Sequence, residues 1–482
     1  MSNKRTWEQE NDTLIENLFK QMFSHIQRQI PGHENGFTVE LFITSECDQR
    51  CEYCYLVKHG HKLYPAPARD HATILHNMDL LFNYLNKNNL VPAHIDIFTG
   101  EIWCSEFGCQ VLQKLLDYVK NLEEPPHQIM IPSNFSFILE EKYLKAIEYY
   151  INAFDYYNVN LAFSCSNDGG ILDRHSRPFH SAEKTEMKDT EEYYKMLFEF
   201  CRKHHFGFHP MVSAYGIEQW GEQYKWWIDK LKEYDMDLYT SIMFLEVRNN
   251  EWTEDKVKSY LEYLNTAIDY TLSAYYNGDV NKIVSDIINL PIEPQRSNCV
   301  LKNYSHLGLG DASKGMSCSI ERAAMIRLGD LAWIPCHRTG YDKFLFGTFK
   351  VENDEIVGIK ANNLPLLFSI HGVGYQGHMK CDICPIGAIC PRGCYGAQFE
   401  HSKELFYPCP TVCDLYFAKI LMLYHKLDYY VQTYGCNFTH FLQQKDYLYR
   451  HYISQIPREE YDKWMPTIER LIRNSSEMRE RC

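Results

Sequence analysis

Several features that define other classes of protein are missing from this sequence. No uninterrupted apolar run is long enough to cross a bilayer, and the N-terminus lacks the apolar core of a signal peptide. There is no low-complexity tract, and acidic residues exceed basic ones, which gives a formal net charge of −14. This charge argues against broad electrostatic binding to nucleic acid or to an anionic membrane. We therefore expect a cytoplasmic globular protein, and 482 residues are enough for more than one domain.

Cysteine, by contrast, is abundant, with 18 residues. A chain without an export signal should keep its thiols reduced, and disulfide scaffolds are usually much shorter than this one. Most of the cysteines fall in tight clusters, which is the pattern of metal ligation. The scattered ones are interpreted as small hydrophobic residues or surface thiols; they are Cys104, Cys109, Cys165, Cys201, Cys436 and Cys482.

The most informative cluster is the CxxxCxxC motif of Cys47, Cys51 and Cys54. Three thiolates cannot complete a four-thiolate zinc site, and they cannot ligate every iron of a four-iron cluster. If they hold such a cluster, one iron stays open to another ligand. An open iron indicates chemistry rather than a purely structural role.

Apolar runs alternate with helical patterns through the first half of the chain. An amphipathic helix is predicted at 12–30, and further helices near 72–87, 105–122, 140–152, 189–204, 219–234 and 254–275. Strands are predicted at Phe37–Thr44, His94–Thr99, Gln128–Pro132, Asn158–Ser164, Gly207–Ser213 and Tyr239–Val247. Because parallel strands need crossover connections, six such units predict a parallel β/α architecture, as an open sheet or a partial barrel.

Polar residues follow several of these strands. In parallel β/α folds ligands bind at the carboxyl ends of strands, and the cysteine loop follows the first of them. Each residue alone could be a turn glycine or a helix cap. Together they predict one rim built from Gly100, Glu101, Ser133, Asn134, Ser166 and Ser213.

The first strand and its CxxxCxxC loop, with Tyr53 before the last cysteine, resemble the radical S-adenosylmethionine (SAM) superfamily. The resemblance implies a [4Fe-4S] cluster on Cys47, Cys51 and Cys54 whose open iron is chelated by the amino and carboxylate groups of SAM. An electron from the cluster then cleaves SAM, and the 5′-deoxyadenosyl radical abstracts a substrate hydrogen. An external electron donor of the flavodoxin or ferredoxin type is an implied partner.

The resemblance also implies which residues contact SAM. Thr99-Gly100-Glu101 corresponds to the family's GGE motif, whose carboxylate faces the SAM ammonium group. Arg177 corresponds to the arginine that holds the SAM carboxylate, with Arg174 as its competitor. Further implied contacts are Tyr53, Ser133, Asn134, Ser166 and Ser213. Glu246 and Arg248 could bind SAM or substrate, or form a buried ion pair.

A second group of cysteines resembles the SPASM extension of this superfamily. Two auxiliary [4Fe-4S] clusters are implied, which makes three clusters in all. The first would use Cys318, Cys336 and Cys394, with Cys299 or an open site in the fourth position. The second would use Cys381, Cys384, Cys390 and Cys413, with Cys409 as the alternative last ligand. Structural zinc is the competing interpretation, because CxxC pairs are common zinc ligands.

Cys318 and Cys336 flank a predicted hairpin that resembles the SPASM hairpin. In the family a glycine occupies its turn, whereas here Leu331 holds that position and Gly329 lies two residues earlier. The remaining sequence from 298 to 413 is predicted to be irregular.

SPASM enzymes mostly modify peptides or proteins. The leading hypothesis is therefore a maturase that forms a carbon–carbon or thioether cross-link, or a related side-chain change, in a ribosomally synthesised precursor peptide. The nearest alternative resembles an anaerobic sulfatase maturase, which oxidises a Cys or Ser to formylglycine. A non-catalytic iron–sulfur or zinc protein that only binds a partner is a third hypothesis.

Four segments are predicted: an N-terminal helix (1–36), a partial (β/α)6 radical-SAM barrel (37–275), a SPASM domain (276–415) and C-terminal helices (416–482). Only 46 residues precede Cys47, too few for the winged-helix module that binds leader peptides in many maturases. Leader binding is expected at 1–36, at the C-terminal helices, or on a separate leader-peptide-binding protein.

Overall fold

The structure is a computed structural model that describes residues 6–25, 37–64, 70–98, 100–277, 323–372, 379–387, 390, 394–435 and 439–475. It contains two compact units, each of which is described by itself. The first comprises 1–165, 179–181 and 296–376, and the second comprises 166–178, 182–295 and 377–482. The four predicted segments stay a prediction, since these units divide the chain elsewhere. Cys299 and Cys318, two candidate cluster ligands, lie outside the described residues.

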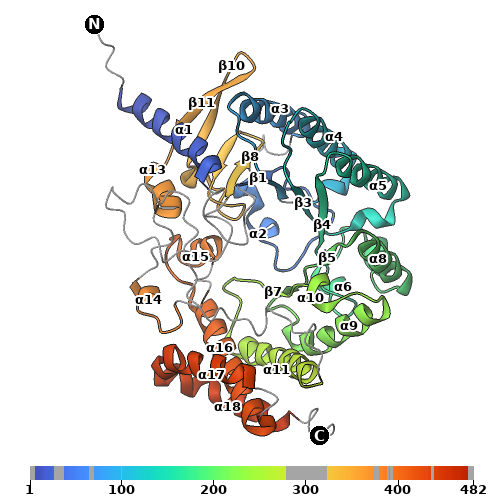
Figure 1. The fold of residues 1–482 in the computed structure, drawn as a ribbon, viewed down its shortest axis with the longest axis vertical. Helices are drawn as coiled ribbons and strands as arrows, with labels where there is room; N and C mark the ends of the chain where they lie inside the picture. Colours follow the sequence, from blue (N-terminus) through green and yellow to red (C-terminus); the bar gives the residue numbers. More distant parts are fainter. Residues whose placement is uncertain are drawn as a thin grey trace. The chain divides into compact units, whose positions relative to one another are not determined.

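A parallel sheet forms the centre of the first unit (Figure 1). Neighbouring strands along the chain pair in parallel, in the order β1 (Thr38–Phe42), β2 (His94–Phe98), β3 (Gln128–Ser133) and β4 (Asn160–Cys165). The connections run through α2 (Tyr55–Leu63), α3 (His71–Lys87), η3 (Ile102–Cys104), α4 (Phe107–Lys120), η4 (Ser136–Leu139) and α5 (Glu141–Asp155). The predicted α/β fold class is confirmed, and these four strands agree with the predicted ranges to within a few residues.

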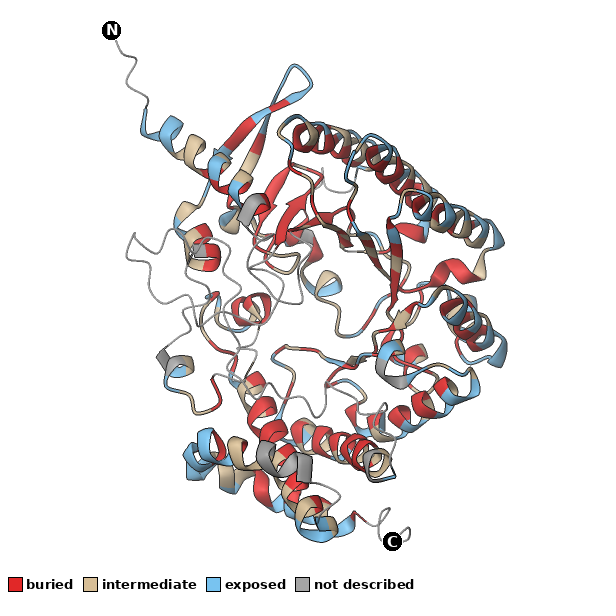
Figure 2. Ribbon diagram, viewed as in Figure 1, coloured by how far each residue is buried: buried red, intermediate tan, exposed pale blue. Residues whose placement is uncertain are grey.

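The helices bury one face each, as their apolar spacing predicts (Figure 2). In α4, the side chains of Val111, Leu112, Leu115, Leu116 and Val119 recur every three or four residues and are all buried. Burial of each such side chain stabilises the fold by roughly 1.5–3 kcal/mol. The packed helices and strands therefore hold the strand ends, and the loops that follow them, in place.

The cysteine-rich region is more regular than the sequence predicts. β8 (Ala323–Arg327) pairs in parallel with β1, and an antiparallel series follows with β9 (Ala332–Ile334), β10 (Gly347–Glu352) and β11 (Glu355–Ala361). η9 (Asp342–Phe344), α13 (Leu364–Leu367) and η10 (Phe368–Gly372) complete this stretch. The prediction of irregular structure is wrong for β10 and β11, which pair with each other and, through β9, continue the sheet beyond the predicted hairpin. β8, which is wholly buried, covers the edge that β1 would otherwise expose.

The predicted hairpin is formed by β8 and β9. Its turn holds Leu331 in the left-handed backbone region (φ +52°), at the position where the family has glycine. This conformation costs a non-glycine residue roughly 1–2 kcal/mol. The Leu331 side chain is buried, and that burial offsets the cost.

The first helix, α1 (Trp7–His25), begins earlier than predicted. The reason is a capping box, in which the Gln9 amide donates to Thr6 Oγ1 at 3.3 Å and the Thr6 amide donates to Gln9 Oε1 at 3.0 Å. α1 packs along the edge strand β11, where Asp12 Oδ1 accepts from the Ala361 amide at 2.7 Å. The helix thereby covers part of that edge.

The second unit is mainly helical. Its first part contains α6 (Asp173–Ser176), α7 (Ala182–Met187), α8 (Glu191–His204), β5 (Gly207–Phe208), β6 (Met211–Val212), η5 (Ile217–Gln219), α9 (Trp220–Glu233), α10 (Leu238–Ser241), β7 (Leu245–Glu246) and α11 (Glu254–Tyr276). The predicted strand Gly207–Ser213 is split in two because Pro210 has no amide to donate to a ladder. β6 and β7 pair in parallel.

The predicted strand Tyr239–Val247 is wrong over its first half. The side chain of Asp237 accepts from the Thr240 amide at 2.9 Å, and its carbonyl accepts from the Ser241 amide at 3.0 Å. An aspartate at this position offers the following residues a helical turn in place of a strand. Only Leu245–Glu246 forms the strand β7.

The second unit ends in α14 (Met379–Asp382), α15 (Tyr395–Ser402), α16 (Pro410–Tyr434), α17 (Thr439–His451), η12 (Ile453–Gln455) and α18 (Arg458–Asn474), with α11 packed beside α16 (Figure 1). The buried Lys426 of α16 forms an ion pair with Asp269 of α11 and donates to Ser475 Oγ at 2.5 Å. Among the described residues, no helix has the length and apolar character needed to span a membrane.

Candidate active site

The three cysteines of the motif lie in the loop between β1 and α2, at the carboxyl end of β1. Cys51 is buried, and Cys47 and Cys54 are half-buried. The Cys54 amide donates to the Cys51 carbonyl at 3.0 Å, which closes a turn that contains the half-buried Tyr53, and Cys54 is the N-cap of α2. Local sequence thus places the three thiols on one short loop, as predicted.

The surroundings of Cys47 fit a metal-bound thiolate. Burial raises the pKa of the Cys47 thiol, and the neighbouring Cys51, Glu101 and Asp48 raise it further. A cationic cluster would supply the positive charge that these crowded thiols need in order to ionise. The Gln49 amide donates to Cys47 Sγ at 3.4 Å, and Asn134 Nδ2 donates to it at 3.9 Å. Hydrogen bonds of this kind tune iron–sulfur clusters.

In the part of the chain that the structure describes, no three His, Cys, Asp or Glu side chains are arranged to hold a single metal ion. A four-iron cluster places each thiolate on a different iron. The donor set of the loop, which is three cysteines, matches that arrangement.

Gly100 allows the end of β2 to approach the cysteine loop. Its backbone is left-handed (φ +59°), and a Cβ atom would lie 2.3 Å from the Glu46 carbonyl oxygen and 2.9 Å from that of Thr44. The next residue, Glu101, donates its amide to the Glu46 carbonyl at 2.6 Å. A glycine is therefore required for steric and conformational reasons. Thr99 lies outside the described residues.

Glu101 is the centre of a buried polar group and is only 2% exposed. Its Oε2 accepts from Ser133 Oγ at 2.9 Å and from the Asn134 amide at 2.7 Å, and its Oε1 accepts from the Trp103 amide at 3.2 Å. Burial, with a further contribution from the Asp48 carboxylate, raises the pKa of Glu101 to about 7. The three hydrogen bonds act in the opposite direction and lower the pKa. The structure thus brings Glu101, Ser133 and Asn134 together as predicted.

One residue near this group was missed by the sequence reasoning. Asp48 lies inside the motif, where its Oδ1 accepts from Asn134 Nδ2 at 2.6 Å and its carbonyl accepts from the His180 amide at 2.8 Å. An acid within a strand-end loop was an available signal for Asp48. Cys104, one of the scattered cysteines, is exposed, in agreement with its interpretation as a surface thiol.

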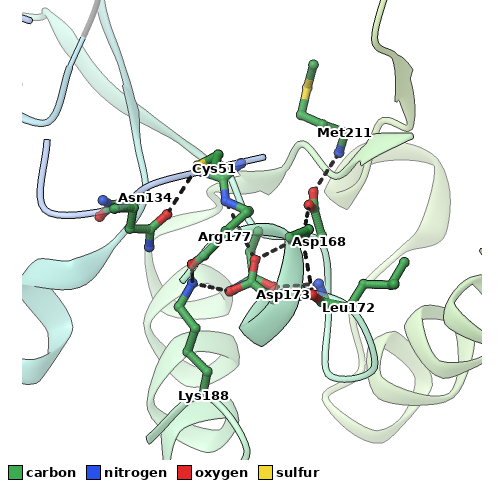
Figure 3. Close-up of polar contacts among 12 residues, drawn as sticks. Cys51, Asn134, Asp168, Leu172, Asp173, Arg177, Lys188 and Met211 are labelled. Carbon is green, nitrogen blue, oxygen red and sulfur yellow. Dashed lines mark hydrogen bonds and ion pairs between the residues drawn. The ribbon is translucent and has the colours of Figure 1, made fainter. Parts of the chain in front are cut away.

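The remaining predicted SAM contacts lie in the second unit. Ser166 is half-buried after β4, and Ser213, just after β6, donates its hydroxyl to the Tyr215 carbonyl at 3.1 Å. Arg177 is buried, with its Nε 3.6 Å from Asp173 Oδ1 (Figure 3). Its competitor Arg174 is half-buried and pairs with Asp189. A buried guanidinium suits ligand recognition better, because it is less screened by water.

Cys336 lies close to the motif within the first unit. Tyr55, the residue after Cys54, has a pKa raised by burial and then by Cys54, with Cys336 adding to it. The adjacent His337 stacks on Phe98 of β2, with ring centroids 4.6 Å apart. The sequence alone did not indicate this proximity.

Five cysteines in the second unit line one cavity of about 550 Å³; they are Cys381, Cys384, Cys390, Cys409 and Cys413. Burial raises the pKa of Cys413, and the neighbours that raise it further are, in order, Cys390, Cys381, Cys384 and Cys409. Cys394 is not among the lining residues and instead forms the N-cap of α15. Both candidate last ligands, Cys409 and Cys413, line this cavity together with Cys381, Cys384 and Cys390.

Comparison with solved structures gives matches across most of the chain. anSMEcpe with bound AdoMet and Cp18Cys peptide aligns at 16% identity and a TM-score of 0.50, covering 80% of this chain and 96% of the other. anSMEcpe with bound AdoMet aligns at 15% identity and a TM-score of 0.49, covering 80% of this chain and 97% of the other. Streptococcus suis SuiB bound to precursor peptide SuiA aligns at 14% identity and a TM-score of 0.44, covering 78% of this chain and 75% of the other.

The chain has the radical SAM/SPASM fold. No family model matches the sequence, and no curated protein matches it either.

Within this radical SAM/SPASM fold, Gly387 is a further residue that the sequence reasoning did not single out. A Cβ on Gly387 would lie 2.4 Å from the Cys381 carbonyl oxygen and 3.1 Å from that of Cys384. Its amide donates to the Cys384 carbonyl at 2.9 Å. Gly387 therefore lets the chain fold back against the CxxC turn that carries two of the predicted ligands.

Glu246 forms an ion pair, and its partner is Lys419 of α16. Glu246 Oε1 lies 2.5 Å from Lys419 Nζ and accepts from the Tyr260 hydroxyl at 2.8 Å. Arg248 Nε donates to the Tyr416 hydroxyl at 3.1 Å, three residues beyond Cys413. These contacts join the end of β7 to α16, the helix that carries Cys413.

Proposed function

We propose that this protein is a radical SAM enzyme that cleaves SAM reductively and modifies a peptide after hydrogen abstraction. The observation that carries the proposal is the contact between Cys47 of the three-cysteine loop and the buried group of Glu101, Ser133 and Asn134. Three thiols with an adjacent buried acid form a site for a cluster and an ammonium group. The radical SAM/SPASM fold and the AdoMet and peptide bound to anSMEcpe support it.

Each residue has a defined role in this proposal. Cys47, Cys51 and Cys54 hold a [4Fe-4S] cluster, which supplies an electron and an open iron to SAM. Glu101 accepts the SAM ammonium group, and Ser133 and Asn134 hold the Glu101 carboxylate in place. Further proposed SAM contacts are Tyr53, Gly100, Ser166, Arg177 and Ser213.

The later cysteines are proposed to hold two auxiliary [4Fe-4S] clusters. Cys336 and Cys394, with Cys318, serve the first, and the cavity-lining set with Cys413 serves the second. The cluster that cleaves SAM must first receive an electron, so a flavodoxin or ferredoxin type of protein is the proposed donor. A cytoplasmic location would keep these oxygen-sensitive sites reduced.

The proposed substrate is a ribosomally synthesised peptide that receives a carbon–carbon or thioether cross-link or a related change. Formylglycine formation on a protein Cys or Ser is the second candidate. The fold that this chain shares with anSMEcpe supports this candidate. The two reactions give chemically different products, because a cross-link removes hydrogen whereas formylglycine is an aldehyde.

The test is anaerobic incubation of the reconstituted protein with SAM, a reductant and a short peptide encoded beside its gene. We expect 5′-deoxyadenosine, together with a peptide that has lost hydrogen and does not react with a hydrazide. A hydrazide-reactive product would favour formylglycine. Absence of 5′-deoxyadenosine from protein with a full iron content would contradict the proposal.

SAM affinity is expected to rise with pH because of Glu101. The raised pKa means that the buried carboxyl is mainly protonated below about pH 7 and cannot then pair with an ammonium group. Between about pH 6 and about pH 8 the ionised fraction grows roughly tenfold, so SAM should bind about tenfold more tightly at the higher pH. Equilibrium dialysis of the reconstituted protein measures this change.

Two variants separate this effect from the titration of SAM itself. Glu101→Gln should bind SAM weakly at every pH and lose the pH dependence, because its amide carries no charge. Glu106→Gln, at an exposed glutamate five residues away, is the matched control and should behave as the unmodified chain. An unchanged pH profile in Glu101→Gln would show that another group binds the ammonium.

A further inference from the structure

The segment between β4 and α8 contains a buried lysine that the proposed function does not use. Lys188, between α7 and α8, is 1% exposed. Lysine is almost never fully buried unless its charge is paired. Its Nζ donates to Asp173 Oδ2 at 2.5 Å and to the Arg177 carbonyl oxygen at 2.6 Å (Figure 3). Lys188 therefore contacts both the main chain of Arg177 and an acid, Asp173, that lies near the Arg177 guanidinium. Asp168 also interacts electrostatically with Arg177.

Asp173 is the acid that Lys188 and Arg177 share. It is 0% exposed, and its Oδ1 accepts from the Asp168 amide at 2.8 Å. Lys188 Nζ lies 2.5 Å from this carboxylate, whereas Arg177 Nε lies 3.6 Å from it. The contact with Arg177 is longer than a hydrogen bond. Lys188 is thus the closer counter-ion of Asp173.

The loop around these charges is held on its other sides as well. Asp168 Oδ2 accepts from Ser176 Oγ at 2.6 Å, and its Oδ1 accepts from the Met211 amide at 2.9 Å. Gln223 Oε1 accepts from the amides of Ile171 and Leu172 at 2.9 and 3.1 Å. These bonds hold the backbone from Asp168 to Ser176 independently of Lys188, whose own main-chain contact is with the Arg177 carbonyl.

The four ionisable side chains form a balanced buried group of two acids, Asp168 and Asp173, and two bases, Arg177 and Lys188. A buried acid that loses its nearest cation binds more strongly to the next one, because the low dielectric of the interior makes an unpaired charge costly. Without Lys188, Asp173 would attract the Arg177 guanidinium. That guanidinium would then be a poorer partner for the carboxylate of a ligand.

We propose that Lys188 is a positioning residue for ligand binding: as the counter-ion of Asp173, it keeps the Arg177 guanidinium directed to the carboxylate of SAM. This inference rests on the proposed function, in which Arg177 binds that carboxylate. Lys188 does not touch the ligand and acts only through Asp173 and the Arg177 carbonyl.

The experiment compares the affinities of the reconstituted full chain for SAM and for decarboxylated SAM, which keeps the ammonium and adenosyl groups. Lys188→Met should weaken SAM binding at least about tenfold and leave the decarboxylated ligand unaffected, since the charged hydrogen bond between Arg177 and the SAM carboxylate is lost. Lys188→Arg should keep most of the affinity. Lys195→Met, at an exposed lysine of α8, is the control.

A double variant distinguishes charge competition from a purely structural role. Asp173→Asn removes the acid's charge and keeps an oxygen that can accept from the Asp168 amide. Combined with Lys188→Met, it should restore SAM affinity, because the acid no longer attracts Arg177. It also leaves no unpaired lysine or aspartate charge, which keeps the test valid if Lys188→Met alone fails to fold.

The outcomes separate this inference from the proposed function. If Lys188→Met loses affinity equally for SAM and for decarboxylated SAM, the role proposed for Lys188 is wrong. The same holds if SAM affinity does not recover in the double variant. If Arg177→Met binds SAM as tightly as the unmodified chain, the carboxylate contact assigned to Arg177 is wrong, and the inference falls with it. SAM cleavage that persists in that case would show that the proposed function itself still holds.

Discussion

Replacement of Cys51 by alanine is expected to abolish SAM cleavage and to remove about four of about twelve irons per chain. Cys51 is the buried member of the three-cysteine loop, and its thiol lies 3.8 Å from Gln49 Oε1. Two cysteines cannot hold a cluster that already leaves one iron open, so the whole cluster should be lost. The measurements are iron analysis and 5′-deoxyadenosine formation after anaerobic reconstitution.

Cys109→Ala is the matched control for this experiment. Cys109 lies in α4, is half-buried and belongs to no predicted cluster. Its variant should keep the iron content and the activity of the unmodified chain. Continued 5′-deoxyadenosine formation by Cys51→Ala would refute the assignment of the loop, whereas zinc in place of iron in the unmodified chain would refute the cluster assignment altogether.

The second large effect is expected at Cys413, whose replacement by alanine should also remove about four irons. The thiol of Cys413 is surrounded by Cys390, Cys381 and Cys384, which are the other predicted ligands of that cluster. Loss of one of four thiolates should destabilise the cluster and, with it, the cysteine-rich segment that the cluster ties together. Iron analysis and the melting temperature of the reconstituted protein report these two changes.

Cys409→Ala is the natural control, because Cys409 lines the same cavity and lies only four residues earlier in the chain. Its thiol is within hydrogen-bond distance of Thr411 Oγ1, at 3.3 Å. The Cys409 variant should keep its iron. If Cys409→Ala loses about four irons and Cys413→Ala does not, Cys409 rather than Cys413 is the last ligand of this cluster.

The strands that the sequence predicted best are those whose apolar residues pair with neighbours close along the chain. β1 to β4 are each joined to the next by a helical connection, so local pattern and tertiary pairing agree. The predictions failed where a single residue changed the local structure, as Pro210 and Asp237 do. They also did not indicate that β8 pairs with β1, which is far away in sequence.

In the candidate site, too, local features were predictable from the sequence and contacts between distant residues were not. Spacing alone predicted the three-cysteine loop and the residues after each strand, because parallel strands end on one side of a sheet. It did not show that Ser133 and Asn134 bind Glu101 rather than pointing elsewhere, nor that Asp48 joins them. Hydrogen bonds between residues far apart in the chain leave no periodic signal in sequence.

The sequence by itself determined the donor types, their spacing and the α/β class of the chain, because thiol spacing and apolar periodicity are local properties. Only the tertiary structure decided which acid is buried, that Cys409 and Cys413 line one cavity with the other cysteines, and that Lys188 is a close counter-ion of Asp173. Those outcomes depend on burial and on charge pairs across loops. Both exist only once distant segments have packed together.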